Sequence, residues 1–125
     1  MRRVELGILV CMSMILAAGS SRAEGTATTV KGYVIDSSCA FVKDLKKPIS
    51  PECAVTCAKA GSPLVILTDS GSIYWPISGT MPATGQNDRL MEFAGKRVTA
   101  TGKVYSKGGS RAIVIEKLEK TPDGK

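Results

Sequence analysis

The 125-residue sequence contains no histidine. This absence removes the commonest general base of enzymes and the commonest metal ligand, and it excludes covalent haem attachment through Cys-x-x-Cys-His. A serine nucleophile elbow is also missing, and Gly108-Gly109 is too short to cradle a phosphate and is typical of a hairpin turn. We therefore expect a binding protein rather than an enzyme, with no catalytic residues.

No apolar run reaches the roughly 20 residues that are needed to span a bilayer. The longest run extends from Leu6 to Ala18, follows two arginines near the start, and leads into small residues that end at Ala23. A basic start, a short apolar centre and a small-residue end are typical of a secretory signal peptide. We predict that residues 1–23 are removed, that the protein is periplasmic or secreted, and that it has no membrane contact afterwards.

Aromatic residues are few, at 5% of the chain, and the basic residues are scattered rather than clustered. The net charge of +6 therefore predicts a solvated basic surface, and export also argues against a nucleic-acid partner. Four aromatic residues on the predicted strands are candidates for a surface that binds a small ligand or a protein: Tyr33, Tyr74, Trp75 and Tyr105. The alternative is that their side chains pack in the barrel. We expect a monomer.

The remaining chain, residues 24–125, has the size of one domain and carries strand signals separated by turn residues. We predict five strands: Thr26–Asp36, Pro63–Thr68, Ser72–Trp75, Lys96–Tyr105 and Arg111–Glu119. Alternation places Val30, Gly32 and Val34 on one face of the first strand. In the last strand it places Ile113 and Ile115 on one face and Leu118 on the other. We expect a frayed tail from about residue 120.

Helix signals are strongest in the segment SPECAVTCAKAG. Ser50 is suited to cap a helix over residues 51–60, and Gly61 is suited to end it in a left-handed conformation. The preceding segment, residues 38–49, has no clear hydrophobic periodicity, which predicts a loop. A second, short helix is expected over residues 87–95, capped by Asn87 or Asp88.

These elements predict a mainly β fold, namely a five-stranded OB-like Greek-key barrel. One Cys-bearing helix follows strand 1, and a short helix precedes strand 4.

The chain contains the frame GYVIDSSC…CAVTCAKAGSPLVILTDSGSIYW…FAGKRVTATGKVYSKGGSRAIVIEKLE. This frame resembles that of small exported bacterial proteins that have an OB-like barrel and a three-cysteine motif, with no assigned activity, and the resemblance covers Val30 to Glu119. Similar sequences often carry a histidine just before the paired cysteines, where this chain has Ser50, Pro51 and Glu52. The resemblance therefore implies the fold and the cysteine motif, but no histidine-containing metal site.

Three of the four cysteines, Cys39, Cys53 and Cys57, lie in the predicted exported domain, whereas Cys11 lies in the signal peptide. Cys53 and Cys57 are four residues apart on the predicted helix, so their Cβ atoms should be about 6 Å apart, whereas a disulfide needs about 3.8 Å. They should therefore not bond to each other, but each can reach Cys39. One interpretation is thus a structural disulfide of Cys39 with Cys53 or with Cys57, which would stabilise the fold by about 3 kcal/mol.

Two further interpretations use all three thiols. Sulfur ligands without histidine favour soft ions, Cu(I) above all and then Zn²⁺. Zinc would need a fourth ligand, for which Asp36, Asp44, Glu52 or water are available. Alternatively, one thiol attacks a disulfide made by the other two, which would make the protein a thiol–disulfide redox protein or sensor. Our hypothesis from the sequence is a small exported binding module with a soft-metal site at these cysteines.

Overall fold

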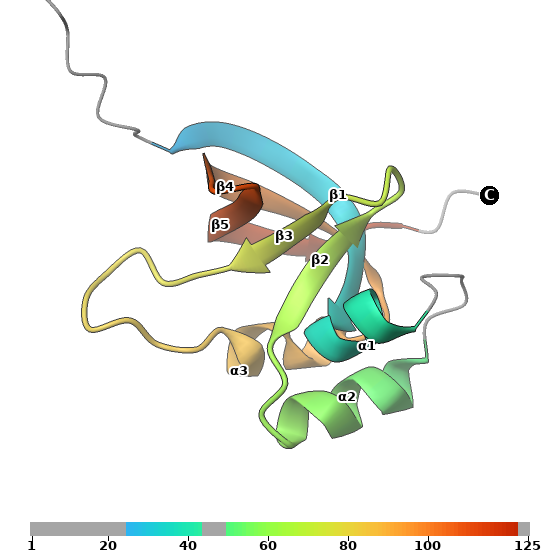
Figure 1. The fold of residues 1–125 in the computed structure, drawn as a ribbon. Helices are drawn as coiled ribbons and strands as arrows, with labels where there is room; N and C mark the ends of the chain where they lie inside the picture. Colours follow the sequence, from blue (N-terminus) through green and yellow to red (C-terminus); the bar gives the residue numbers. More distant parts are fainter. Residues whose placement is uncertain (1–24, 44–49, 123–125) are drawn as a thin grey trace, which may run out of the picture.

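The computed structural model describes residues 25–43 and 50–122, and the predicted signal peptide lies outside the described residues. Five strands form a closed barrel in the order β1-β2-β3-β5-β4 (Figure 1). Their bounds are Thr26–Asp36 (β1), Leu64–Thr68 (β2), Ile73–Pro76 (β3), Arg97–Lys107 (β4) and Ser110–Lys120 (β5). Strand β1 is antiparallel to both β2 and β4, and β3 is parallel to β5. This topology confirms the predicted five-stranded, OB-like barrel.

Strand β1 closes the barrel because it pairs with β4 along most of its length and with β2 at its end. The predicted alternation is confirmed, since Val30 and Val34 are buried in the barrel core. Gly32 lies between them and pairs with both neighbouring strands. A Cβ atom at Gly32 would collide with the backbone carbonyl of Leu67. Only glycine therefore lets β1 approach β2 this closely.

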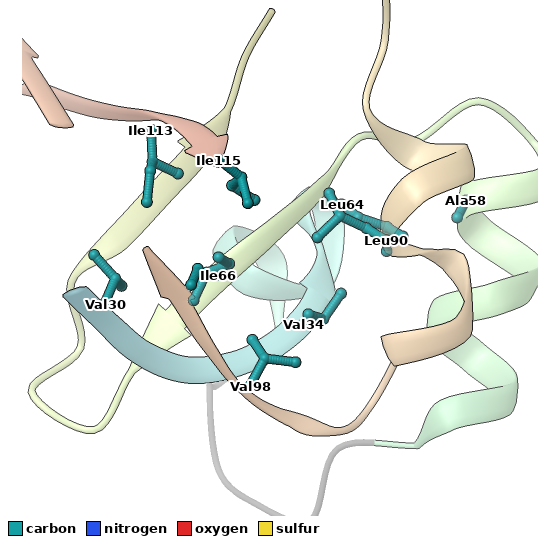
Figure 2. Close-up of a cluster of buried hydrophobic side chains, with 10 residues drawn as sticks. Val30, Val34, Ala58, Leu64, Ile66, Leu90, Val98, Ile113 and Ile115 are labelled. Carbon is teal, nitrogen blue, oxygen red and sulfur yellow. The ribbon is translucent and has the colours of Figure 1, made fainter. Parts of the chain in front are cut away.

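The core is built from aliphatic side chains of the strands and is closed at one end by helices (Figure 2). Its buried members are Val30, Val34, Ala58, Leu64, Ile66, Leu90, Val98, Ala100, Ile113 and Ile115. Helix α3 (Asn87–Leu90) and the 3-10 helix η1 (Met91–Phe93) replace the single short helix that was predicted. In Figure 2 the side chain of Leu90 lies beside Leu64, and Ala58 of α2 (Pro51–Lys59) faces them. The α2–α3 side of the barrel is therefore sealed by apolar contacts.

Helix α2 forms where the sequence predicted it. The Ser50 side chain caps its first turn, Pro51 is its first residue, and Gly61 beyond its end has a φ of 101°. These are local interactions, so the sequence alone is sufficient to predict them.

The predicted loop over residues 38–49 is wrong in its first part, because residues 37–42 form helix α1 (Ser37–Val42). Asp36 caps this helix: its side chain accepts a hydrogen bond from the backbone N–H of Cys39. The helix is too short for a helical period, and Phe41 and Val42 on it are exposed. It therefore lacks the apolar pattern by which helices are predicted. Within the part of the chain that the structure describes, two helices thus carry cysteines, not one.

The predicted face of Leu118 is also wrong, because β5 contains a bulge. Thr101 pairs with Lys117 and Gly102 pairs with Ile115, so Glu116 has no partner on β4. One extra residue reverses the alternation beyond it. Leu118 consequently packs against the same core as Ile115.

Candidate metal centre

Three thiols meet where helices α1 and α2 lie side by side at one end of the barrel (Figure 1). Cys39 is on α1, and Cys53 and Cys57 are on α2. Their Sγ atoms all lie within 4.8 Å of one another, and the Sγ atoms of Cys39 and Cys53 are 3.8 Å apart. No disulfide joins these three described cysteines, which are all half-buried. The structure therefore brings together the residues that the sequence singled out.

Matching helix caps place two of the sulfurs. Cys39 and Cys53 are each the third residue of their helix, after the capping residues Asp36 and Ser50. The Asp36 carboxylate accepts from the N–H of Cys39 at 3.1 Å, and the Ser50 hydroxyl accepts from the N–H of Cys53 at 3.2 Å. Cys57 lies one helical turn further along α2, on the same face as Cys53. Two capped first turns thus fix the backbone beneath the cluster.

The carboxylate of Asp36 is completely buried beside this cluster. Its Oδ2 atom accepts hydrogen bonds from the N–H of Cys39 and, at 3.3 Å, from the hydroxyl of Ser62. Its Oδ1 atom has no hydrogen-bond partner among the described residues. A buried charge that is only partly paired is destabilising. A cation at the cluster would offset that cost.

The surroundings of the cluster favour the protonated thiols as long as no cation is bound. The Asp36 side chain, followed by burial and the neighbouring Cys53, raises the pKa of Cys39 to about 12. Burial, followed by the charges of Asp36 and Cys53, raises the pKa of Cys57. A bound cation would act in the opposite direction, because its positive charge lowers the pKa values of the thiols that coordinate it. The surroundings therefore disfavour free thiolates, whereas thiolates that share a positive ion would be favoured.

The sulfur triangle has the dimensions of a metal site. An ion bound to sulfurs at about 2.3 Å separates them by about 4.0 Å in a trigonal plane and by about 3.8 Å in a tetrahedron. The observed separations, 3.8 Å for Cys39 and Cys53 and at most 4.8 Å for every pair, need only small side-chain movements to reach either value. The three cysteines can therefore hold one metal ion, while the triangle alone does not select the metal.

The three carboxylates considered as a fourth zinc ligand differ in their surroundings. Asp36 is buried, whereas Glu52 is exposed and accepts a hydrogen bond from the Ser50 hydroxyl at 3.1 Å. Asp44 lies outside the described residues. Within the described part of the chain, Asp36 is thus the carboxylate that is withdrawn from water at the cluster.

Sequence reasoning missed a supporting role for Asn87. We expected Asn87 or Asp88 to cap the short helix, but Gln86 occupies the cap position and makes no side-chain capping bond. The Asn87 amide instead donates to the carbonyls of Ser62, at 2.9 Å, and Ala58, at 3.2 Å, and accepts from the N–H of Leu64 at 2.8 Å. It therefore ties the end of α2 to β2 and holds Ser62, which bonds to Asp36. No local sequence pattern predicts these hydrogen bonds.

The four aromatic candidates have different surroundings. Tyr74 packs against the barrel core, and Tyr105 lies against Gly25. The Tyr33 ring lies beneath the Arg97 guanidinium, 5.5 Å from it.

Trp75 stacks with Phe41 of α1, with ring centroids 6.1 Å apart, and the two line a shallow groove that also includes Ser72 and Arg111. Trp75 thus lies at a groove, where a ligand could contact it.

Comparisons with protein families, curated proteins and solved structures find no match to this chain. The resemblance to exported barrel proteins therefore stays a prediction from the motif frame. Within residues 25–43 and 50–122, the structure contains no helix with the length and apolar character of a membrane span.

Proposed function

We propose that this chain is a small exported binding module that holds one soft metal ion through Cys39, Cys53 and Cys57. The observation that carries the proposal is the convergence of three sulfurs, from two separately capped helices, within 4.8 Å of one another. The buried, partly paired Asp36 carboxylate supports it, because a cation would offset this charge. The protein acts by binding rather than catalysis, as a monomer, in the periplasm or outside the cell.

Metal binding would also stabilise the fold, because the ion would link α1 to α2. A ligand that binds only the folded state at 100 times its dissociation constant adds about 2.7 kcal/mol to the free energy of unfolding.

The test is metal binding by the purified protein after reduction and removal of metal, without oxygen. Cu(I) and Zn²⁺ are added separately, and bound metal is measured by mass spectrometry after gel filtration. We expect one ion per chain, a raised thermal midpoint, and loss of both effects in Cys39→Ser, Cys53→Ser and Cys57→Ser. Ser38→Ala, which changes an exposed neighbour of Cys39, is the matched control and should bind as the wild type does. A wild type that binds neither ion would refute the proposal.

The second candidate function is thiol–disulfide exchange, which the short distance between Cys39 and Cys53 favours. Their sulfurs, 3.8 Å apart, can form a disulfide after a small movement, with Cys57 positioned to attack it. The raised pKa values of Cys39 and Cys57 oppose this chemistry, because the attacking species is the thiolate.

Thiol counting on protein recovered from an oxidising compartment separates the candidates. One free thiol, no metal and fast exchange with an added disulfide would establish the redox function. The same thiol count with slow exchange would establish a structural disulfide on a ligand-binding barrel. Three thiols released only when a chelator removes the metal would establish the metal centre.

A further inference from the structure

The Asp36 carboxylate provides an oxygen atom that no described residue uses. We propose that Asp36 is the fourth ligand of the metal centre, and that its set of three sulfurs and one oxygen selects Zn²⁺ over Cu(I). This inference rests on the proposed function and names the ion that the centre takes. It reverses the order suggested by the sequence, in which sulfur ligands alone placed Cu(I) first.

The geometry around α1 supports this role. Asp36 directly precedes the helix, and its carboxylate folds over the first turn to accept from the N–H of Cys39 at 3.1 Å. Oδ2 makes this bond and a second one with Ser62, while Oδ1 has no partner among the described residues. The side chain is fully buried, so bulk water does not compensate for the missing partner.

Asp36 also links the two helices that carry the sulfurs. It caps α1 through the N–H of Cys39, and it accepts from Ser62, whose own N–H donates to the carbonyl of Cys57 on α2 at 3.0 Å. The three sulfurs form the group of ligand atoms that lie within 4.8 Å of one another, and Asp36 is not in that group. Its side chain would therefore have to rotate towards the sulfurs when the ion binds.

The chemistry of the donor set distinguishes the two ions. Zn²⁺ commonly takes carboxylate oxygen together with thiolate sulfur in four-coordinate sites. Cu(I) is softer and is satisfied by thiolates alone. Three thiolates and one carboxylate carry four negative charges, of which Zn²⁺ neutralises two and Cu(I) only one. Because uncompensated charge is destabilising in a buried site, the divalent ion is favoured.

The experiment compares wild type with Asp36→Asn in competition titrations against chromophoric chelators, with Zn²⁺ and with Cu(I). Asparagine is as good a helix cap as aspartate, so the variant keeps the Cys39 contact and removes only the charge and the anionic oxygen. We expect the Zn²⁺ affinity to fall by roughly 10–100-fold. The Cu(I) affinity should change by less than about threefold, since no Cu(I) bond is lost. Glu52→Gln, which removes an exposed acid beside Cys53, is the matched control and should change neither affinity.

A second measurement uses only the wild type and does not depend on the folding of any variant. In ¹³C NMR spectra, the carboxyl resonance of Asp36 should shift when Zn²⁺ is added in equimolar amount. The carboxyl resonances of Asp69 and Asp88, which lie on other elements, should not shift. A shift of all three would indicate a general change of the fold and not a ligand role.

The outcomes separate this inference from the proposed function. If the wild type binds neither Zn²⁺ nor Cu(I), both proposals fail. A second outcome is that metal binding depends on the cysteines, but Asp36→Asn leaves the Zn²⁺ affinity unchanged or lowers the affinities for Zn²⁺ and Cu(I) equally. In that case the metal centre stands and the role of Asp36 is refuted.

Discussion

Individual residues at the cysteine cluster have environments that differ from what their sequence positions suggest. Cys39 follows a strand and seemed to be a loop residue, but it is held in the first turn of α1 by Asp36. The sequence showed that three thiols lie near one another along the chain. That Asp36 is buried with an oxygen atom that no described residue pairs depends on how α1, Ser62 and β1 pack, which no local pattern reveals.

The raised pKa of Cys39 predicts that the reduced, metal-free protein loses stability at alkaline pH. The folded-state pKa is about 12, against an ordinary value of 9.0. Below pH 9.0 the Cys39 thiol is protonated in both the folded and the unfolded state, so it does not lower the free energy of unfolding there. As the pH rises above it, the unfolded chain releases the proton first, so the free energy of unfolding declines until the folded thiol also ionises.

Urea unfolding of the wild type and Cys39→Ser between about pH 8 and about pH 11 measures this effect. The wild-type midpoint should fall more steeply, because the variant keeps only the contribution of Cys57 and the groups common to both proteins. Parallel declines in the two proteins would contradict the prediction.

At the scale of elements, the predictions succeeded where a helix or strand is defined by its own residues. Helix α2 has its cap, its first-turn proline and its terminal glycine within one short segment. Helix α1 has only the cap at Asp36 as a local signal. Its Phe41 and Val42 are exposed, so the helix lacks the buried apolar face by which helices are predicted from sequence. The contact between α1 and α2 that forms the centre could not be predicted, because it depends on how both pack against the barrel.

Asn87 is the residue on which the placement of α2 depends most clearly. Asn87→Ala removes three hydrogen bonds to Ala58, Ser62 and Leu64 and leaves partly buried backbone groups unsatisfied. We expect a loss of about 2–3 kcal/mol in the free energy of unfolding, measured by urea denaturation.

A metal titration of the same variant should show weaker Zn²⁺ binding, because Ser62 and the end of α2 are released together. Gln86→Ala, which removes only an exposed bond to the carbonyl of Thr84, is the control and should cost no more than about 0.5 kcal/mol. Equal losses in the two variants would show that Asn87 has no special role.

At the scale of the whole molecule, closure of the barrel positions the centre. Strand β1 leads directly into α1, and β2 begins soon after α2, so the pairing of β1 with β2 holds the two helices at the same end of the barrel. This pairing depends on Gly32, where a side chain would collide with the Leu67 carbonyl.

Gly32→Ala should therefore destabilise the entire fold and not a single element. We expect a loss of about 1–3 kcal/mol, since the obstacle is backbone and cannot rotate away. Chemical denaturation monitored by Trp75 fluorescence measures it. The matched control is Gly85→Ala, where a Cβ atom meets open space, and this change should stay within about 0.5 kcal/mol. A neutral Gly32→Ala would show that β1 can shift without loss.

The sequence by itself determined the five strand segments, helix α2 and the sulfur character of the site, because periodicity, capping and the absence of histidine are properties of short segments or of composition. Only the tertiary structure decided the inward turn of Leu118, the role of Asn87 and the burial of Asp36. These features depend on contacts between segments that are far apart in the chain. The physical reason is that burial and charge are set by what packs around a residue, which its sequence neighbours do not specify.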